Sequence, residues 1–162
     1  MRLKNPSFWA AALVGLIVDQ VTKLLVFSTF ELGQTIPLIQ DVFHLTFVTN
    51  KGAAFSLFSE SGEWLRWLSL LVSLGLIALG WFSRLNRWEQ FGYGFILAGA
   101  AGNGIDRFLR GEVVDFFDFR LIQFPVFNVA DICINLGIAC LLIVAFRPQN
   151  GNGQAKRPPT RD

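Results

Sequence analysis

The sequence predicts an all-α polytopic membrane protein with four transmembrane helices and a small β-sheet subdomain on its outer surface. Of the 162 residues, 52% are hydrophobic and 16% are charged, and the mean hydropathy is +0.46. Soluble domains contain about 25% charged residues, so this chain is depleted in charge. A membrane-spanning helix needs roughly 20 mostly apolar residues. Four segments come close to this: 8–30, 64–82, 91–109 and 126–146.

The first helix, 8–30, starts like a signal peptide, with a basic tip and an apolar run. No small-residue cleavage site closes it, so we expect a permanent helix. The following loop contains an alternating stretch, 42–48, which predicts a strand. Residues 50–52 have turn chemistry, and 53–58 would return as the partner strand.

The second helix, 64–82, has Trp64 and Trp67 near one end and Trp81 near the other, as in the aromatic belts of membrane proteins. The third helix, 91–109, is rich in Gly and Ala. Small residues let neighbouring helices approach closely, so we expect this helix at the centre of the bundle. The fourth helix, 126–146, repeats this feature more weakly.

The placement of basic residues indicates the orientation. Eight of the fourteen Lys and Arg lie before the first helix, between the second and third, or after the fourth: Arg2, Lys4, Arg84, Arg87, Arg147, Lys156, Arg157 and Arg161. The positive-inside rule then places both termini in the cytoplasm and the loops 32–63 and 110–125 outside. Residues 1–147 form a single membrane domain, and the polar tail 148–162 is expected to be disordered.

Polar side chains gather toward the predicted outer side, which indicates a water-accessible cavity there. Asp115 and Asp131 stand out because each lies at the edge of apolar sequence. An ionisable group at membrane depth costs about 2.5 kcal/mol or more, so it usually has a partner or a task. A pair of carboxylates can supply a general acid and a general base. The polar residues that gather toward the predicted outer side are Asp19, Lys23, Asn50, Asn103, Asp106, Arg107, Asp115, Asp118, Asn128 and Asp131.

Two charged pairs have structural interpretations as well. Asp19 and Lys23 are four residues apart on one helix and can neutralise each other, which we favour over a catalytic role. Asp106 and Arg107 form either an ion pair that closes the third helix or, through Arg107, a positive charge that holds the aspartates.

The asparagines also have two interpretations. The amides of Asn50, Asn103 and Asn128 suit either a substrate backbone and the aspartates, or capping and turn formation. Asp118 is the rival for the second carboxylate. It lies three residues from Asp115, so on a strand it would point to the opposite face, and we assign it to solvent.

Five blocks occur in order along the chain: 19–23 (DQVTK), 50–55 (NKGAAF), 102–107 (GNGIDR), 113–116 (VVDF) and 127–131 (FNVAD). Together they resemble the motifs of the lipoprotein signal peptidase family, also called signal peptidase II. The resemblance implies a bacterial intramembrane aspartyl protease of the cytoplasmic membrane, with its active site toward the outer face. Such an enzyme removes the signal peptide from prolipoproteins, just before a cysteine that carries a diacylglyceryl group.

By motif, the resemblance implies catalytic roles for Asp115 and Asp131. The resemblance favours a role in substrate binding or in support of this pair for six further residues: Asn50, Asn103, Arg107, Asn128, Asp19 and Lys23. It implies no metal or organic cofactor. The implied partners are prolipoproteins with a lipidated cysteine, membrane lipids and inhibitory cyclic peptide antibiotics.

The chemistry also follows from the residues. Two close carboxylates share a proton, so the ionised one can activate water and the protonated one can hydrogen-bond the scissile carbonyl. Either aspartate can hold that proton, because a coupled pair titrates as a unit. We expect the first outer loop to clamp the substrate and to move. Its aromatic and aliphatic side chains would rest on lipid or substrate: Phe43, Leu45, Phe47, Phe55 and Phe58.

Other classes of protein fit less well. A transporter or proton channel would spread its acidic residues through the bilayer or show inverted repeats, and neither is evident. A structural subunit would explain the Gly-rich helix but not the gathered Asp and Asn. Nucleic-acid binding is disfavoured because no basic face appears. His44 has no second ligand at zinc spacing, and Cys133 and Cys140 are too far apart along one helix to be bridged.

Overall fold

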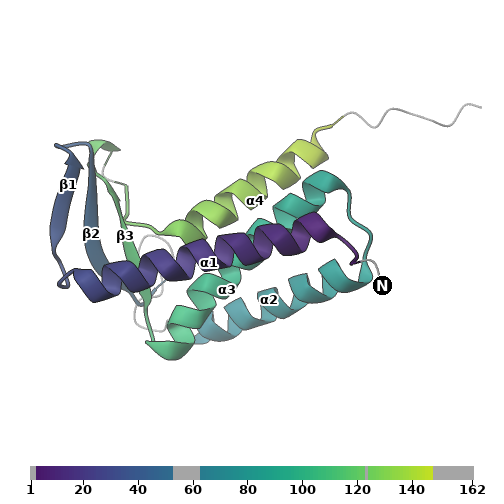
Figure 1. Cartoon of the computed structure of the whole chain (residues 1–162), viewed down its shortest axis with the longest axis horizontal. Helices are drawn as coiled ribbons and strands as arrows, with labels where there is room; N and C mark the ends of the chain where they lie inside the picture. Colours follow the sequence, from purple (N-terminus) through teal and green to yellow (C-terminus); the bar gives the residue numbers. More distant parts are fainter. Residues whose placement is uncertain (1–2, 53–62, 123, 148–162) are drawn as a thin grey trace, which may run out of the picture.

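The computed structural model describes residues 3–52, 63–122 and 124–147, which form four helices with a three-stranded antiparallel sheet at one end (Figure 1). Each of the four segments that we expected to be helical is helical, and the ends differ by at most four residues. The helices are α1 (Pro6–Thr29), α2 (Trp64–Phe82), α3 (Arg87–Leu109) and α4 (Val129–Ala145). The expected tail 148–162 lies outside the described residues.

Local sequence explains where the helices begin. Pro6 opens α1, where its missing N–H is not needed. Asn86 begins α3 and Asn128 begins α4 with the same device, a capping box. In each box the asparagine oxygen accepts a backbone hydrogen bond from the third helical residue, whose carboxylate accepts one in return.

Two of the described helices, α1 and α2, are long and apolar enough to cross a membrane. The apolar helix α4 has 17 residues, about 25 Å, which is short of a bilayer core of about 30 Å. Large apolar side chains on the bundle surface are exposed, as at Leu13 and Leu71, and would face lipid. The four spans expected from the sequence therefore remain a prediction for α3 and α4.

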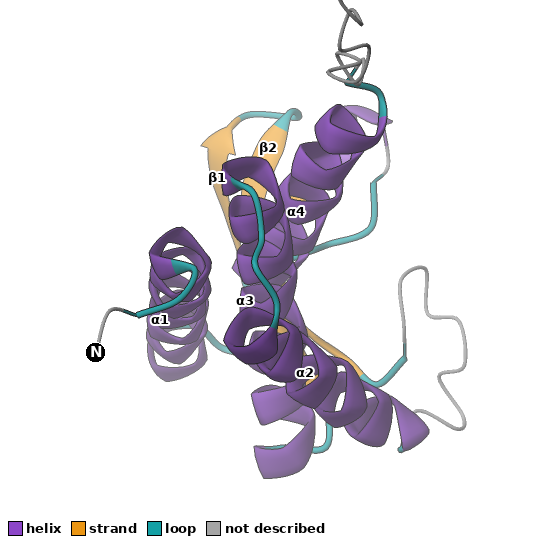
Figure 2. Ribbon diagram, turned by 90° about the vertical axis from the view of Figure 1, so that its right-hand side faces the viewer, coloured by secondary structure: helices purple, strands orange, loops and turns teal. Residues whose placement is uncertain are grey.

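Helix α3 lies at the centre of the bundle, as its small residues predict (Figure 2). It packs against α1, α2 and α4. A Cβ atom added to Gly92 would lie 2.7 Å from the Leu141 side chain, and one added to Gly137 would lie 2.6 Å from the Gly92 carbonyl. The close contact of α3 with α4 therefore requires glycine on both helices.

The sheet joins the loop between α1 and α2 to the loop between α3 and α4. Its order is β1 (Thr35–Ile39), β2 (Phe43–Asn50) and β3 (Val113–Phe119), and both pairings are antiparallel. The alternating stretch 42–48 is confirmed as strand β2. The partner strand expected at 53–58 lies outside the described residues, and β2 pairs with β1 and with β3 from the second loop.

A cluster of buried side chains attaches the sheet to the bundle. Phe47 of β2 packs with Val26 of α1 and with Val114 and Phe116 of β3. The expectation that Phe47 rests on lipid or substrate is therefore wrong. A bulge between Leu45 and Val48 changes the register of β2 against β3, so a simple alternation does not predict which face Phe47 takes.

Candidate active site

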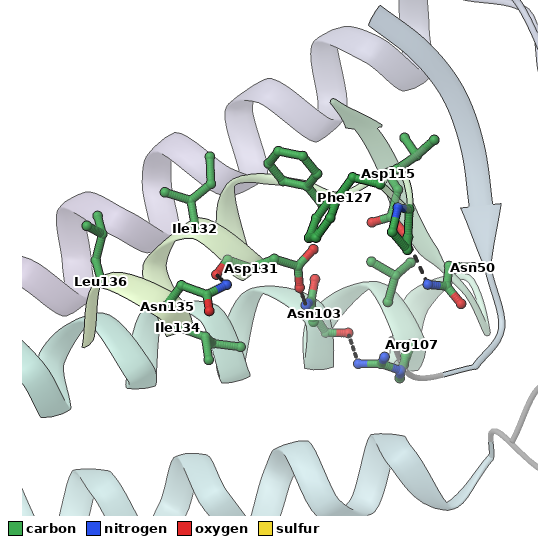
Figure 3. A pocket seen from close by; sticks show the side chains of 14 residues that line it. Asn50, Asn103, Arg107, Asp115, Phe127, Asp131, Ile132, Ile134, Asn135 and Leu136 are labelled. Atoms are coloured by element: carbon green, nitrogen blue, oxygen red, sulfur yellow. Dashed lines mark hydrogen bonds between the residues drawn. The ribbon is translucent and has the colours of Figure 1, made fainter. Parts of the chain in front are cut away.

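Asp115 and Asp131 come from different elements and line the same cavity (Figure 3). Asp115 is buried in the middle of β3, whereas Asp131 is half-buried in the first turn of α4. Phe117 and Phe127 exchange backbone hydrogen bonds of 2.8 and 3.0 Å, which hold the start of α4 beside β3. The cavity between these elements has a volume of about 650 Å³.

Asn128 is fully buried and contacts both aspartates. As the N-cap of α4, its side-chain oxygen accepts a hydrogen bond from the Asp131 amide at 3.1 Å. The backbone N–H of Asn128 donates to the Asp131 carboxylate, also at 3.1 Å. Its Nδ2 donates to Oδ1 of Asp115 at 2.6 Å. The capping role and the site role, alternatives in the sequence, thus belong to one side chain.

Asn103 and Asn50 supply the remaining side-chain donors to the two carboxyl groups. Asn103 Nδ2 donates to Oδ1 of Asp131 at 3.1 Å, and Asn50 Nδ2 donates to Oδ2 of Asp115 at 3.2 Å. Asn50 Oδ1 accepts from the Gly52 amide at 2.9 Å, so Asn50 also forms the turn. All four carboxyl oxygens therefore have a donor, which fixes the orientation of both groups.

Lys23 is the centre of a buried ionic cluster behind the aspartates. Its Nζ lies 3.0 Å from a carboxylate oxygen of Asp19 and 3.0 Å from one of Asp106. It also donates to Asn103 Oδ1 at 2.8 Å. Asp19 in turn accepts from the Ala130 amide at 2.8 Å. The expected pair of Asp19 and Lys23 is present, and it connects α1 to the first turn of α4 and to the site.

The ion pair between Asp106 and Arg107, one of the two alternatives that the sequence left open, is not formed. Asp106 pairs with Lys23 and, at 2.8 Å, with Arg110 one turn further along α3. The spacing of four residues between Asp106 and Arg110 could have predicted this ion pair from the sequence, because residues four apart share a helix face. Arg107 instead lines the cavity and donates to the carbonyls of Gly52 and Asn103 at 3.2 and 3.4 Å.

The surroundings of Asp115 disfavour its charged form. Burial, and then the nearby charge of Asp131, raise the pKa of Asp115 to about 7. The hydrogen bonds from Asn50 and Asn128 and the charge of Lys23 act in the opposite direction and are outweighed. At neutral pH a substantial fraction of Asp115 is therefore protonated.

Asp118 is not in the cavity, as its place on the strand predicts, but its assignment to solvent is wrong. Its side chain is largely buried and accepts hydrogen bonds from Thr46 Oγ1 at 2.7 Å and Arg120 Nε at 2.9 Å. Burial opposes its ionisation, but these hydrogen bonds and the charge of Arg120 outweigh burial and lower its pKa. Asp118 is thus an ionised, structural carboxylate on the opposite face of β3.

The described residues contain no group of three or more His, Cys, Asp or Glu that could hold a metal ion. His44 is buried next to Asp118 in the sheet register, and neither of its ring nitrogens has a hydrogen-bond partner there. Cys133 and Cys140 are both free thiols, and Cys133 is buried.

One wall of the cavity is apolar apart from a single amide. Asn135 is exposed on α4, one helical turn after Asp131, and is not among the site residues expected from the sequence. Its signal was the spacing of four residues from Asp131 within an otherwise apolar stretch. The apolar side chains of the wall are Phe124, Pro125, Val126, Phe127, Ile132, Ile134 and Leu136.

Comparisons with known proteins identify the family of the chain. A sequence model of the family described as signal peptidase (SPase) II matches residues 11–147. A lipoprotein signal peptidase of Cyanothece sp. is 61% identical, and the match covers 99% of this chain and 95% of the relative. A lipoprotein signal peptidase of Nostoc punctiforme is 64% identical, with 91% and 94% of the two chains covered.

The fold is similar to that of a solved structure described as a bacterial membrane enzyme. The TM-score is 0.79, the sequences are 30% identical, and the match covers 93% of each chain. A second bacterial membrane enzyme matches with a TM-score of 0.76 at 30% identity, over 86% of this chain and 92% of the other. These likenesses support a membrane enzyme with apolar helices.

Proposed function

Because the chain belongs to the signal peptidase II family, whose members are peptidases that process lipoproteins, we propose that it is an aspartic endopeptidase with Asp115 and Asp131 as its catalytic pair. Its substrates are prolipoproteins with a diacylglyceryl-modified cysteine. The observation that carries this proposal is the meeting of two carboxyl groups, from β3 and α4, on one cavity of about 650 Å³.

The division of roles follows from the surroundings of the two groups. Asp115 is buried and its raised pKa favours the protonated form, so it holds the shared proton at rest. Asp131 is half-buried and serves as the carboxylate. Asp131 takes a proton from a water molecule while that water attacks the scissile carbonyl carbon. Asp115 donates a hydrogen bond to the carbonyl oxygen, and a proton then passes to the leaving nitrogen.

The supporting residues keep this geometry rigid. Asn128, Asn103 and Asn50 hold the carboxyl groups through their amides. Asp19 and Lys23 hold the first turn of α4 and Asn103 from behind. Arg107 lines the cavity, where its guanidinium can contact the substrate and moderate the negative charge of the pair.

The setting is the bacterial cytoplasmic membrane, with both termini in the cytoplasm and the sheet on the outer face. The apolar signal peptide lies along the apolar wall formed by α4, and the two acyl chains stay in lipid. A cyclic peptide antibiotic that inhibits this family would compete for the same cavity. Neither ion transport nor a purely structural role accounts for the family membership.

The test is cleavage of a lipidated precursor by single variants. We expect Asp115→Asn and Asp131→Asn to abolish turnover while the protein still inserts, because the pair loses its acid or its base. Asp118→Asn is the matched control, a carboxylate on the same strand that faces away from the cavity, and it should retain turnover. Turnover in either of the first two variants would refute the assignment.

A further inference from the structure

Asn135 places a partly unpaired amide on the apolar wall of the cavity. Its Nδ2 donates to the Asp131 carbonyl at 2.9 Å, one helical turn back along α4. Among the described residues, its Oδ1 and its second amide hydrogen have no hydrogen-bond partner in the structure. Figure 3 shows Asn135 between Asp131 and the apolar side chains of Ile132, Ile134 and Leu136. Because Asn135 is exposed on the cavity wall, its remaining donor and acceptor are accessible to a molecule bound there.

A bound precursor would bring unpaired groups to the same place. This step rests on the proposed function. A helical signal peptide satisfies its own backbone, but a peptide bond must be unwound before water can attack it. Unwinding frees backbone N–H and C=O groups, and at membrane depth no bulk water satisfies them. The site must therefore supply partners on the cytoplasmic side of the scissile bond.

We propose that Asn135 binds the unwound backbone of the precursor at the peptide group about two residues before the scissile bond. The register follows from dimensions. Asn135 lies four residues from Asp131, about 6 Å along α4 at 1.5 Å per residue. An extended peptide covers about 3.3 Å per residue, so this distance corresponds to about two residues. Helix α4 runs from the sheet toward the opposite end of the bundle (Figure 1). In the proposed orientation, the signal peptide extends in this direction.

The chemistry of the side chain favours a backbone partner over a particular side chain of the precursor. A carboxamide offers an acceptor and a donor side by side, which matches a peptide group. The residues beside Asn135 are apolar and suit apolar side chains of the signal peptide. Because every precursor has the backbone amide, Asn135 contributes to binding of all precursors alike.

A structural role is the competing explanation. The hydrogen bond from Asn135 to the Asp131 carbonyl could hold the first turn of α4 without any contact with substrate. Asn135→Ser separates the two roles, because a serine hydroxyl can make the same bond to the carbonyl four residues back but is shorter. Asn135→Leu removes both contacts at similar volume.

The experiment uses the full-length protein in lipid and synthetic lipidated precursors in which one peptide bond is replaced by an ester. An ester lacks the N–H and has a weaker carbonyl acceptor. One precursor carries the ester two residues before the scissile bond, and a control precursor carries it four residues further toward the N-terminus. Wild type, Asn135→Leu, Asn135→Ser and Leu142→Ala are compared, since Leu142 is exposed on α4 and does not line the cavity.

We expect the near ester to lower kcat/KM of wild type and Leu142→Ala roughly fivefold, the worth of one neutral hydrogen bond. Asn135→Leu should be roughly fivefold weaker on the all-amide precursor, mainly through KM, and insensitive to the near ester. The far ester should affect all four proteins equally. The inference would be overturned if the near ester lowered kcat/KM by the same factor in wild type and Asn135→Leu. It would also be overturned if Asn135→Ser had the kcat/KM of wild type but cleaved the amide and near-ester precursors equally well.

These outcomes are distinct from failure of the proposed function. If Asp115 and Asp131 are not the catalytic pair, their asparagine variants still cleave. If only the inference fails, the asparagine variants are inactive and wild type is active, but the ester and Asn135 show no coupling.

Discussion

A buried carboxyl group beside a second carboxylate resists losing its proton, and Asp115 is in this position. Burial and the charge of Asp131 raise its pKa to about 7 from the ordinary 3.8. If Asp115 supplies the acid, the active form is the one in which it is protonated. We therefore expect kcat to fall as the pH rises through about 7, which a pH profile measured in lipid will show.

Asn50 allows a second test of the predicted pH dependence. Its amide stabilises the ionised form of Asp115, so Asn50→Leu should raise the pKa of Asp115 further and shift the alkaline fall to higher pH. A variant that only disturbs the turn would lower kcat at every pH without moving the midpoint. A rise of kcat through pH 7 in wild type would contradict the assignment of the acid.

The same pKa shift has a consequence for stability. Because the folded state keeps a proton that the unfolded chain loses above 3.8, the contribution of Asp115 to stability is full below that pH. It is lost as the pH rises through about 7. The raised pKa of Asp115 therefore makes the folded state less stable at neutral pH than at acidic pH, as far as this group is concerned.

At the scale of the elements, the contact between α3 and α4 holds the residues of the site together, because Asn103 lies on one helix and Asp131 on the other. Gly137→Ala should weaken this contact, since the added Cβ would lie 2.6 Å from the Gly92 carbonyl and 2.6 Å from the Ile96 side chain. We expect a lower midpoint of thermal unfolding and lower turnover, both measured in detergent or lipid.

Gly75→Ala is the matched control for this prediction. A Cβ at Gly75 on α2 would meet nothing within 4 Å. Replacing an unhindered helical glycine by alanine stabilises a helix by roughly 0.5–1 kcal/mol, so the midpoint should stay the same or rise. A similar loss in both variants would show that glycine at 137 is not required by close packing.

The buried ionic cluster is the second connection between elements. Lys23 is 1% exposed, and its two carboxylate partners, Asp19 and Asp106, are 0% exposed. Lys23→Met leaves Asp106 with Arg110 alone and removes the cation beside Asp19, and removing one member of a buried ion pair costs about 3–5 kcal/mol. We expect a large fall in the midpoint of thermal unfolding and loss of turnover.

The exposed pair of Arg66 and Glu63 is the control for Lys23→Met. Its nitrogen and oxygen lie 3.4 Å apart, with exposed fractions of 33% and 88%. Solvent screens such a pair, so Arg66→Met should change the midpoint little. Equal effects from Lys23→Met and Arg66→Met would mean that the buried cluster adds no stability.

At the scale of the whole molecule, the sheet makes one platform from two loops that are distant in sequence. Movement of β2 relative to β3 would break their ladder of hydrogen bonds. We therefore expect that a disulfide across the ladder leaves turnover unchanged, which revises our expectation for the first outer loop as far as residues 35–50 are concerned. Phe43→Cys with Phe119→Cys fits this test, since the two residues are directly opposite.

The control for the disulfide is the same double variant in its reduced form. Turnover of the oxidised and reduced proteins should agree, and electrophoretic mobility will show that the bond has formed. A large drop on oxidation alone would show that β2 and β3 must separate during catalysis.

The sequence predicted much of the fold because the relevant signals are local. Hydropathy over 8–30 and 64–82 marks α1 and α2, small residues place α3 at the centre, and alternation over 42–48 marks β2. The pairing of β2 with β3 was not predicted, because it joins segments about 70 residues apart and no local pattern encodes a partner. For the same reason Phe47 was assigned to the wrong surroundings.

The same distinction between local patterns and long-range contacts applies to the site. The types of residue and their order made Asp115 and Asp131 the candidates, and the spacing of Asp19 and Lys23 gave their contact. That Lys23 also binds Asp106 and Asn103 depends on how α1 packs against α3. The alternative in which Asp106 pairs with Arg107 is not realised, because adjacent residues on a helix point in different directions, whereas Arg110 shares the face of Asp106.

By itself, the sequence determined the apolar helices and the glycine-rich centre and made two aspartates the candidates for the site, because periodicity, composition and motif order are properties of the chain. The tertiary structure alone decided that β3 and the start of α4 meet, through the backbone bonds between Phe117 and Phe127. It also decided that the Asp115 carboxyl group is buried whereas that of Asp131 is half-buried. Burial and distance depend on segments far apart in sequence, so only the folded chain fixes them.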